Sequence, residues 1–359
     1  MESKLHQDIR KSFTIPTDYY NQETYFEASK DSIFGSTWQY VDSLSKRNFS
    51  NKCEPFFLLP GILDEPLLMT KNEEDSFHCL SNVCTHRGMI LQEESGNQNR
   101  LRCRYHGRCF DLKGKFLSMP KFEEAENFPS DLDNLNQVPF SLKFDSLFVS
   151  LNPFISFDEL LEPITKRLSW LPLEELELVP EVSKDYTVKA HWALYCENYL
   201  EGFHIPFVHP ALNRAIEFDD YESFLYPYCN LQLGIAKEDE PSFEIPSGAE
   251  DFGKRVYGYY WWVFPNLMLN FYPWGLSLNY VQPINKTESK VLFRSYKFPN
   301  QTFNREEFQL DKTEMEDESV VEKVQLGVKS RFYSAGRFSP SMEKGVHHFH
   351  LLLKEFLKI

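Results

Sequence analysis

The sequence has no excess of positive charge, because 53 acidic residues outnumber 38 basic ones and the formal net charge is −15. Nucleic acids and anionic membrane surfaces attract basic proteins, so this balance argues against either as a partner. Long hydrophobic runs are also lacking. The most apolar stretch, residues 259–278, is interrupted by Pro265, Pro273 and several asparagines, which argues against a membrane span.

A secretory signal and a disulfide framework are lacking as well. The first residues, MESKLHQDIRKSF, contain no apolar core of the kind that a signal peptide needs. Seven cysteines are an odd number in a large chain, and they are better explained as thiols of a reducing compartment, some of them metal ligands. We therefore expect a cytoplasmic protein.

The pattern along the 359 residues favours two domains and contains no internal repeat. Residues 1–36 predict a short helical lead-in that packs on the domain formed by residues 154–359. Residues 37–153 contain short β runs, with a hairpin turn at residues 113–115, and predict an all-β domain. Residues 154–359 combine a β meander with helices at 157–171, 313–333 and 343–357, which indicates an α+β domain. The polar segment 214–254 is expected to cover a site as a lid.

Two short motifs form the first candidate metal site. Cys84-Thr-His86 is followed after sixteen residues by Cys103-Arg-Tyr-His106, and each motif offers one thiolate and one imidazole. A Rieske [2Fe–2S] cluster requires this set, with two cysteines on one iron and two histidines on the other. A zinc site and four unrelated residues are the alternatives, but zinc sites usually pair cysteine with cysteine and histidine with histidine.

A second candidate site lies in ENYLEGFHIPFVH, which places Glu201, His204 and His209 close together. Residues 201 and 204 would share one face of a helix, whereas residues 204 and 209 would diverge by about 140° on an ideal helix. Pro206 and Pro210 are expected to distort the helix and let the two imidazoles meet. Two histidines and one carboxylate form the facial triad of ferrous oxygenases. Structural histidines near a helix end are the alternative.

Asp317 is the candidate for the missing carboxylate. It belongs to an acidic helix start, for which compensation of the helix dipole is the general explanation. Asp317 differs from Glu318 and Glu322 because it heads a predicted apolar stripe, and a carboxylate that faces the core needs a partner such as a metal. The stripe is formed by valines at helical spacing: Val320, Val321, Val324 and Val328.

These motifs resemble those of Rieske-type, ring-hydroxylating-like non-haem iron oxygenase α subunits. CTHRG and CRYHG are similar to that family's cluster loops, and ENYLEGFHIPFVH is similar to its catalytic-helix motif. Respiratory Rieske proteins carry two further cysteines that form a disulfide, whereas this chain has Met89 and Tyr105 at those positions. The resemblance implies a [2Fe–2S] cluster, Fe(II) and a helix-grip catalytic domain with a central antiparallel sheet.

The same resemblance implies roles for single residues and for the assembly. The family's third iron ligand falls in the acid pair Glu316–Asp317. Glu201 matches an acid that links an iron-binding histidine to a cluster histidine of a neighbouring subunit. The expected assembly is a homotrimer arranged head to tail, in which each cluster serves the next subunit's iron.

The branch of the family that the chain most resembles includes choline monooxygenase and the glycine betaine and carnitine oxygenases. That resemblance rests on residues 192–350, including PNLMLNFYPWGLSLNYVQP, and implies a small quaternary ammonium substrate and O2. Aromatic faces hold quaternary ammonium groups. Candidate aromatics alternate on predicted strands, although core packing could also explain each of them: Tyr259, Tyr260, Trp261, Trp262, Phe264, Tyr272 and Trp274.

Two other functions stay open from the sequence alone. One is an aromatic-ring dioxygenase α subunit, and the other is a Rieske electron-transfer protein without an oxygenase site. The chain contains no flavin, nicotinamide or plant-type ferredoxin motif, so electrons are expected from a separate NAD(P)H-dependent reductase or ferredoxin. His347, His348 and His350 lie in a predicted amphipathic helix, where packing explains them better than metal binding.

Overall fold

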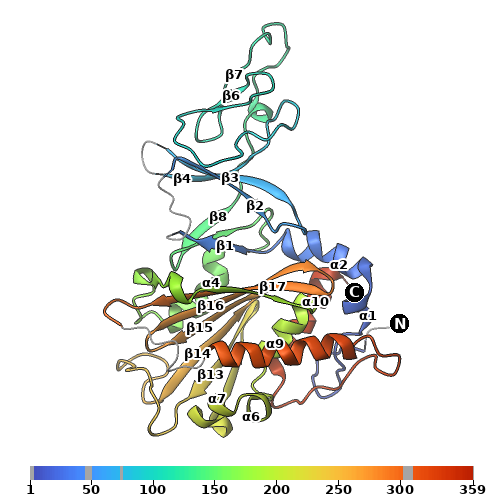
Figure 1. Cartoon of the computed structure of the whole chain (residues 1–359), viewed down its shortest axis with the longest axis vertical. Coiled ribbons are helices and arrows are strands. Elements are labelled where there is room, and N and C mark those ends of the chain that lie inside the picture. The colour runs from blue at the N-terminus through green and yellow to red at the C-terminus, as the bar shows by residue number, and fades with distance from the viewer. Residues whose placement is uncertain (1–3, 45–50, 73–75, 302–309, 359) are drawn as a thin grey trace. The chain divides into compact units, whose positions relative to one another are not determined.

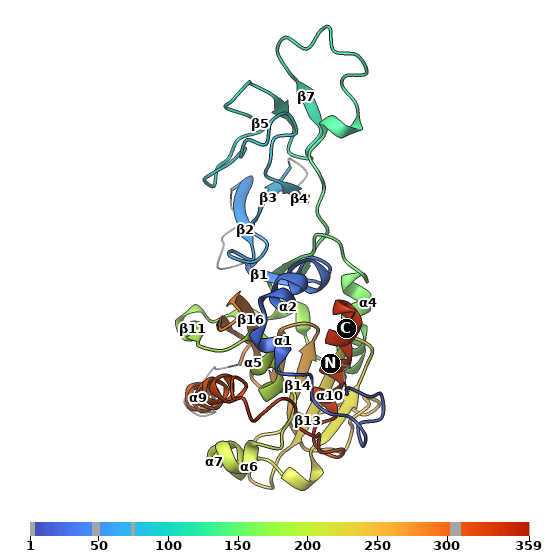
Figure 2. The same cartoon turned by 90° about the vertical axis from the view of Figure 1, so that its right-hand side faces the viewer.

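The computed structural model describes residues 4–44, 51–72, 76–301 and 310–358, and the chain divides into two compact units (Figure 1, Figure 2). The smaller unit is Trp38–Pro153. The larger unit joins Met1–Thr37 to Phe154–Ile359, so the N-terminal segment belongs with the C-terminal half of the chain.

The smaller unit is built from antiparallel sheets, and its described residues form three of them with three strands each. Their orders are β1-β9-β8, β2-β3-β4 and β5-β6-β7. The strands are β1 (Gln39–Ser43), β2 (Cys53–Leu58), β3 (Glu65–Lys71), β4 (Phe77–Ser81), β5 (Leu101–Arg102), β6 (Cys109–Phe110), β7 (Phe116–Ser118), β8 (Phe140–Lys143) and β9 (Ser146–Val149). The predicted hairpin turn joins β6 to β7, where Gly114 has a φ of +81° that glycine adopts without strain.

The larger unit contains a central antiparallel sheet, and its described strands run in the order β10-β17-β16-β15-β14-β13-β12, with β11 also paired to β17. This confirms the predicted α+β class with an antiparallel sheet. The strands are β10 (Glu177–Leu178), β11 (Lys184–Val188), β12 (Glu222–Leu225), β13 (Cys229–Ile235), β14 (Val256–Val263), β15 (Leu267–Tyr272), β16 (Gly275–Asn285) and β17 (Glu288–Lys297).

Helices pack around this sheet (Figure 1), and α5, which is labelled in Figure 2, contacts both α9 and α10. Gly345 at the start of α10 permits a close approach, because a Cβ there would lie 2.3 Å from the carbonyl oxygen of Leu200. The helices are α1 (Asp18–Asn21), α2 (Glu23–Ser29), the π-helix η1 (Lys30–Phe34), α4 (Phe157–Arg167), α5 (Trp192–Tyr199), α6 (Ile205–Val208), α7 (Pro210–Ala215), α9 (Leu310–Gly327) and α10 (Lys344–Leu357).

Two expectations about these elements were wrong. The segment 214–254 is not simply a lid, because β12 and the buried strand β13 lie within it and pair with the central sheet. The helix expected to reach residue 333 ends at Gly327. The N-terminal segment does contain the expected short helices, which lie between Asp18 and Phe34 among the described residues.

Within the described parts of the chain, no helix combines the length and the hydrophobicity that crossing a membrane would require.

Candidate metal centres

The two cysteine–histidine motifs of the smaller unit adopt matching loops. The Gly88 N–H donates to the Cys84 carbonyl at 3.0 Å, and the Gly107 N–H donates to the Cys103 carbonyl at the same distance. Both glycines have positive φ, +70° and +79°, so the same backbone turn is made twice. The matching turns bring the cysteines of both motifs into one apolar cluster and the two imidazole rings close together.

Sulfur and nitrogen donors are separated by depth in these loops. Cys84 and Cys103 are each 2% exposed and belong to one apolar cluster with Leu101 and Phe110. The rings of His86 and His106 are partly exposed and lie 4.8 Å apart between centroids. Burial and a hydrogen bond with Cys103 raise the pKa of the Cys84 thiol. Two buried thiols beside two outer imidazoles fit a Rieske cluster, because its metal supplies the charge that holds the sulfurs as thiolates.

The three candidate residues of the second motif do not share one helix, which corrects the helical prediction. Helix α5 ends at Tyr199, His204 is the residue before α6, and His209 lies between α6 and α7. Gly202, which follows α5, lets the ring of Tyr221 approach the backbone closely, since a Cβ there would lie 2.7 Å from that ring. The break thus begins before Pro206, and the two prolines start the short helices that follow.

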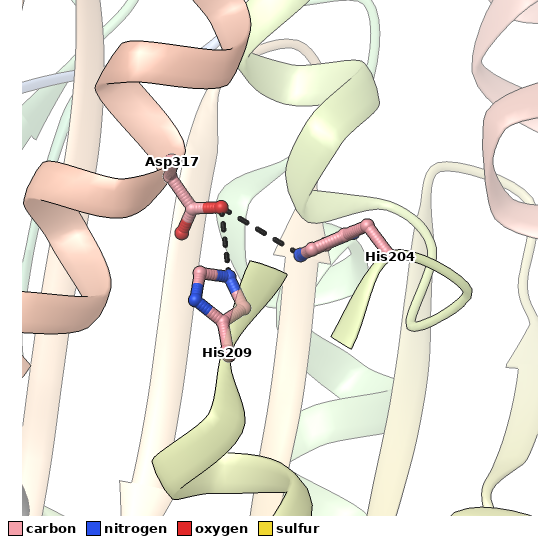
Figure 3. A group of neighbouring side chains, drawn as sticks. All are labelled: His204, His209 and Asp317. Carbon is pink, nitrogen blue, oxygen red and sulfur yellow. Dashed lines mark hydrogen bonds and ion pairs between the residues drawn. The ribbon is translucent and has the colours of Figure 1, made fainter. Parts of the chain in front are cut away.

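Asp317 of α9 meets both imidazoles (Figure 3). Its Oδ1 lies 3.0 Å from His209 Nε2 and 3.6 Å from His204 Nε2. One donor atom from each of these three residues lies within 4.8 Å of the other two. Metal–ligand bonds of about 2.1 Å place neighbouring octahedral ligands about 3 Å apart, so the two distances from Asp317 Oδ1 are close to those that one cation would require.

The expected valine stripe does not explain how Asp317 is oriented. Val321 and Val328 are 1% and 4% exposed, but Val324 is 42% exposed. The carboxylate is instead held by Asn198 of α5, whose Nδ2 donates to Asp317 Oδ1 at 2.6 Å. Packing of α9 against α5 therefore places this carboxylate.

Each imidazole also contacts a second carboxylate through its other nitrogen. His204 Nδ1 lies 2.8 Å from Glu201 Oε1, and the His204 backbone N–H donates to Glu201 Oε2 at 3.0 Å. His209 Nδ1 lies 2.9 Å from Glu316 Oε2. A carboxylate that accepts a hydrogen bond from Nδ1–H fixes the tautomer and leaves the Nε2 lone pair free for a metal.

The charge balance also supports a site for a metal cation. Three carboxylates surround two imidazoles, which is an excess of negative charge that a bound cation would balance. Burial alone would lower the pKa of His209, but hydrogen bonds and charge from Asp317 and Glu316 raise it above its ordinary value. The residues present fit a divalent non-haem iron. Sequence reasoning gave no individual role to Glu316 or Asn198, because no pattern separates them from other residues of α9 and α5.

A pocket of about 110 Å³ opens beside these residues. The register of the sheet explains one wall, because Gln232, Tyr260, Asn270 and Ser277 face one another across four neighbouring strands. All four line the pocket, together with Tyr199, Tyr221 and Tyr272. Of the predicted aromatics, Tyr260 and Tyr272 reach this pocket, whereas Trp261 and Trp262 are fully buried in the core.

The three C-terminal histidines lie apart from this centre. His347 Nε2 lies 2.8 Å from the His6 carbonyl, and His350 Nδ1 accepts the Ile15 N–H at 3.1 Å. His348 Nε2 lies 3.2 Å from the Pro227 carbonyl. These contacts connect α10 to backbone groups, including the N-terminal segment.

The fold and the two sites define a class of protein, and comparison with known families identifies it. Residues 57–129 match the Rieske [2Fe-2S] domain, and residues 173–358 match the catalytic domain of the ring-hydroxylating alpha subunit. The chain belongs to the ring-hydroxylating α-subunit family. It is a Rieske-type oxygenase, whose cofactors are a [2Fe–2S] cluster and non-haem iron, and this confirms the resemblance stated from its motifs.

Its relatives include two kinds of monooxygenase. The chain is 29% identical to the carnitine monooxygenase oxygenase subunit of Escherichia coli K12, over 97% of this chain and 95% of that protein. It is 26% identical to the chloroplastic choline monooxygenase of Arabidopsis thaliana, over 98% of this chain and 84% of that protein.

Solved structures share the fold at lower identity. An inhibitor complex of the quaternary ammonium Rieske monooxygenase CntA superimposes with a TM-score of 0.76 at 21% identity, covering 99% of this chain and 98% of the other. Naphthalene 1,2-dioxygenase from Rhodococcus sp. reaches 0.69 at 15% identity, covering 96% and 94%.

Proposed function

We propose that this chain is the oxygenase subunit of a monooxygenase that hydroxylates a small quaternary ammonium compound. The observation that carries the proposal is the position of His204, His209 and Asp317 at a pocket lined with tyrosines. The relatives named for choline and carnitine support the same substrate class. Hydroxylation inserts one atom of O2 into a C–H bond and reduces the other to water, with two electrons and two protons from outside the substrate.

The pocket offers what a quaternary ammonium group binds. Such a cation donates no hydrogen bonds and is attracted to the faces of aromatic rings. Tyr260 and Tyr272 are 8% and 7% exposed, and Tyr272 is stacked on Trp274 at 5.3 Å and 12°. Tyr199 and Tyr221 also line the pocket, and the carboxylates of Glu201 and Asp317 add negative charge to it.

We assign one set of ligands to a mononuclear iron and the other to the Rieske cluster. His204, His209 and Asp317 would hold Fe(II), which activates O2 when bound. Cys84, His86, Cys103 and His106 would hold the Rieske cluster. The proposed domains are a Rieske domain at residues 37–153 and a catalytic domain at residues 154–359, with residues 1–36 as a lead-in to the latter. An oxygenase of this kind should contain about three iron atoms and two acid-labile sulfides per chain.

Glu201 would serve electron transfer between subunits of a homotrimer. Its carboxylate holds His204 through both the backbone N–H and Nδ1. We propose that it also accepts a hydrogen bond from a cluster histidine of the neighbouring subunit, in a head-to-tail ring that closes on itself. A separate NAD(P)H-dependent reductase or a ferredoxin would supply the electrons.

Substrate-dependent O2 uptake tests the proposal. The purified protein, with its iron and cluster quantified, would be assayed with a compatible reductase and a panel of quaternary ammonium compounds and aromatic acids. Uptake and a hydroxylated product with a quaternary ammonium compound are expected. Uptake with aromatic compounds alone would instead favour an aromatic-ring dioxygenase.

A further inference from the structure

The polar groups of the pocket wall have an uneven distribution of donors and acceptors. Asn270 Nδ2 donates to the Ser277 carbonyl at 3.0 Å, and Asn198 Nδ2 donates to Asp317. The Tyr199 hydroxyl donates to Asn270 Oδ1 at 2.7 Å. Ser277 Oγ donates to Asn279 Oδ1 at 3.2 Å. These four donors of the wall are thus already directed to acceptors of the protein, whereas the buried Tyr260 hydroxyl, which can donate or accept, has no such partner in the described structure.

Gln232 is the opposite case. Its Nε2 donates to the Tyr199 carbonyl at 2.7 Å, and because a carbonyl can only accept, this bond identifies which end of the amide is nitrogen. The other end, Oε1, is buried and has no hydrogen-bond partner in the described structure. Gln232 is 2% exposed and lines the pocket. A buried acceptor without a partner is costly, and a donor on the bound molecule would relieve that cost.

The charges of the pocket also favour a substrate that carries no carboxylate. Among its lining residues in the described chain there is no lysine or arginine, whereas Glu201 and Asp317 are acidic. A carboxylate on the substrate would enter a pocket that has no lysine or arginine among its described lining residues and would lie close to Glu201, Asp317 and the unpartnered acceptor of Gln232. Burial of an unpaired carboxylate is strongly unfavourable.

We propose that this pocket selects quaternary ammonium compounds whose other end is an uncharged hydrogen-bond donor, such as a hydroxyl group, and rejects those that end in a carboxylate. Gln232 is the specificity-determining residue, and its Oε1 accepts the hydrogen bond from that donor. This inference rests on the proposed function and narrows its substrate class.

The test compares four probes on the iron-loaded, cluster-containing enzyme with its reductase. The probes are choline, trimethylpropylammonium (the same cation with methyl in place of hydroxyl), glycine betaine and carnitine. We expect kcat/KM for choline to exceed that of trimethylpropylammonium by about tenfold or more. Choline should exceed the two carboxylates by about 100-fold or more. Calorimetric binding to the oxidised enzyme should rank the probes in the same order without turnover.

Two variants test whether Gln232 causes the preference for choline over trimethylpropylammonium. Gln232→Met keeps the approximate volume and removes the acceptor, so the ratio of kcat/KM for choline to that for trimethylpropylammonium should fall towards one. Gln282→Met, at a partly buried glutamine of β16 outside the pocket lining, should keep the preference. The cluster spectrum and the thermal midpoint check that each variant is folded. If Gln232→Met does not fold, the order of kcat/KM for the four probes on the wild-type enzyme decides the inference.

The outcomes separate this inference from the proposed function. Faster turnover of glycine betaine or carnitine than of choline, or equal turnover of choline and trimethylpropylammonium, would overturn the inference and leave the proposed function in place. If none of the four cations is bound or oxidised by a fully loaded enzyme, the proposed function fails as well.

Discussion

The cluster loops and the histidine–carboxylate centre hold their side chains by different means. In the loops, backbone hydrogen bonds and two positive-φ glycines make the same turn twice, within residues 84–107. In the other centre the acids of α9 lie more than 100 residues from His209 along the chain. The loops depend on local backbone geometry, whereas the second centre depends on how α9 packs against α5.

The two centres should therefore respond differently to substitution of a single side chain. A loop whose turn is formed by its own backbone should persist when one side chain is replaced, although the cluster would be lost. In the second centre the carboxylates hold the imidazoles, so replacing one acid changes both a ligand and the orientation of its neighbours. Substitutions can therefore separate the two centres.

The largest effect is expected from His106→Ala. The cluster would lose one of the two nitrogen ligands of its outer iron, so the Rieske visible and electron paramagnetic resonance spectra should disappear together with all turnover. Iron at the other centre should be retained, because that centre shares none of these ligands. The control is His78→Ala in β4 of the same unit, which should keep the spectrum. An unaltered Rieske spectrum in His106→Ala would show that this ligand is wrongly assigned.

Asp317→Ala should abolish turnover and mononuclear iron but preserve the cluster. The carboxylate contacts both imidazoles, and its loss removes the oxygen ligand of the proposed triad. Iron analysis should fall from about three to about two atoms per chain, with sulfide unchanged. Glu322→Ala on the same helix is the matched control, since Glu322 accepts a hydrogen bond from the Lys189 backbone at 3.0 Å. Iron loss in Glu322→Ala but not in Asp317→Ala would identify a different acid as the ligand.

The contrast between the centres also explains what the sequence could predict. The cysteine–histidine spacing suffices to propose one cluster, because its ligands and turn glycines are adjacent in the chain. The β runs follow from the residue pattern and its turns, and the central antiparallel sheet is what the family resemblance implies. The strands β12 and β13 were not predicted, because they lie in a polar segment that was expected to be a lid. Glu316 and Gln232 acquire their roles only through α9 packing and sheet register, which no local pattern encodes.

Glu201→Gln sharpens the comparison because it tests a residue that would connect the two kinds of centre. The variant keeps an acceptor near His204 but removes the negative charge. Both metal centres and the oligomer should persist, while oxidation of the reduced cluster in a single turnover with substrate and O2 slows about 100-fold. The exposed Glu217→Gln variant should react at the wild-type rate. Unchanged kinetics in Glu201→Gln, or full activity in a proven monomer, would leave the bridging role without support.

The smallest effect is expected from Glu316→Gln, which should weaken iron binding about tenfold, the low end for partners of metal ligands. Glu316 accepts from His209 Nδ1 at 2.9 Å, and its charge makes Nε2 a better ligand. The same charge helps to raise the pKa of His209 in the metal-free protein, so protons compete with iron more strongly in the wild type. As pH falls from about 8 to about 6, wild-type affinity should therefore drop further than that of the variant, and the tenfold gap should narrow. Titration of the metal-free enzyme with Fe(II) without oxygen measures both affinities, with Glu322→Gln as the control on α9. A gap that is the same at both pH values would mean that Glu316 does not act through the protonation of His209.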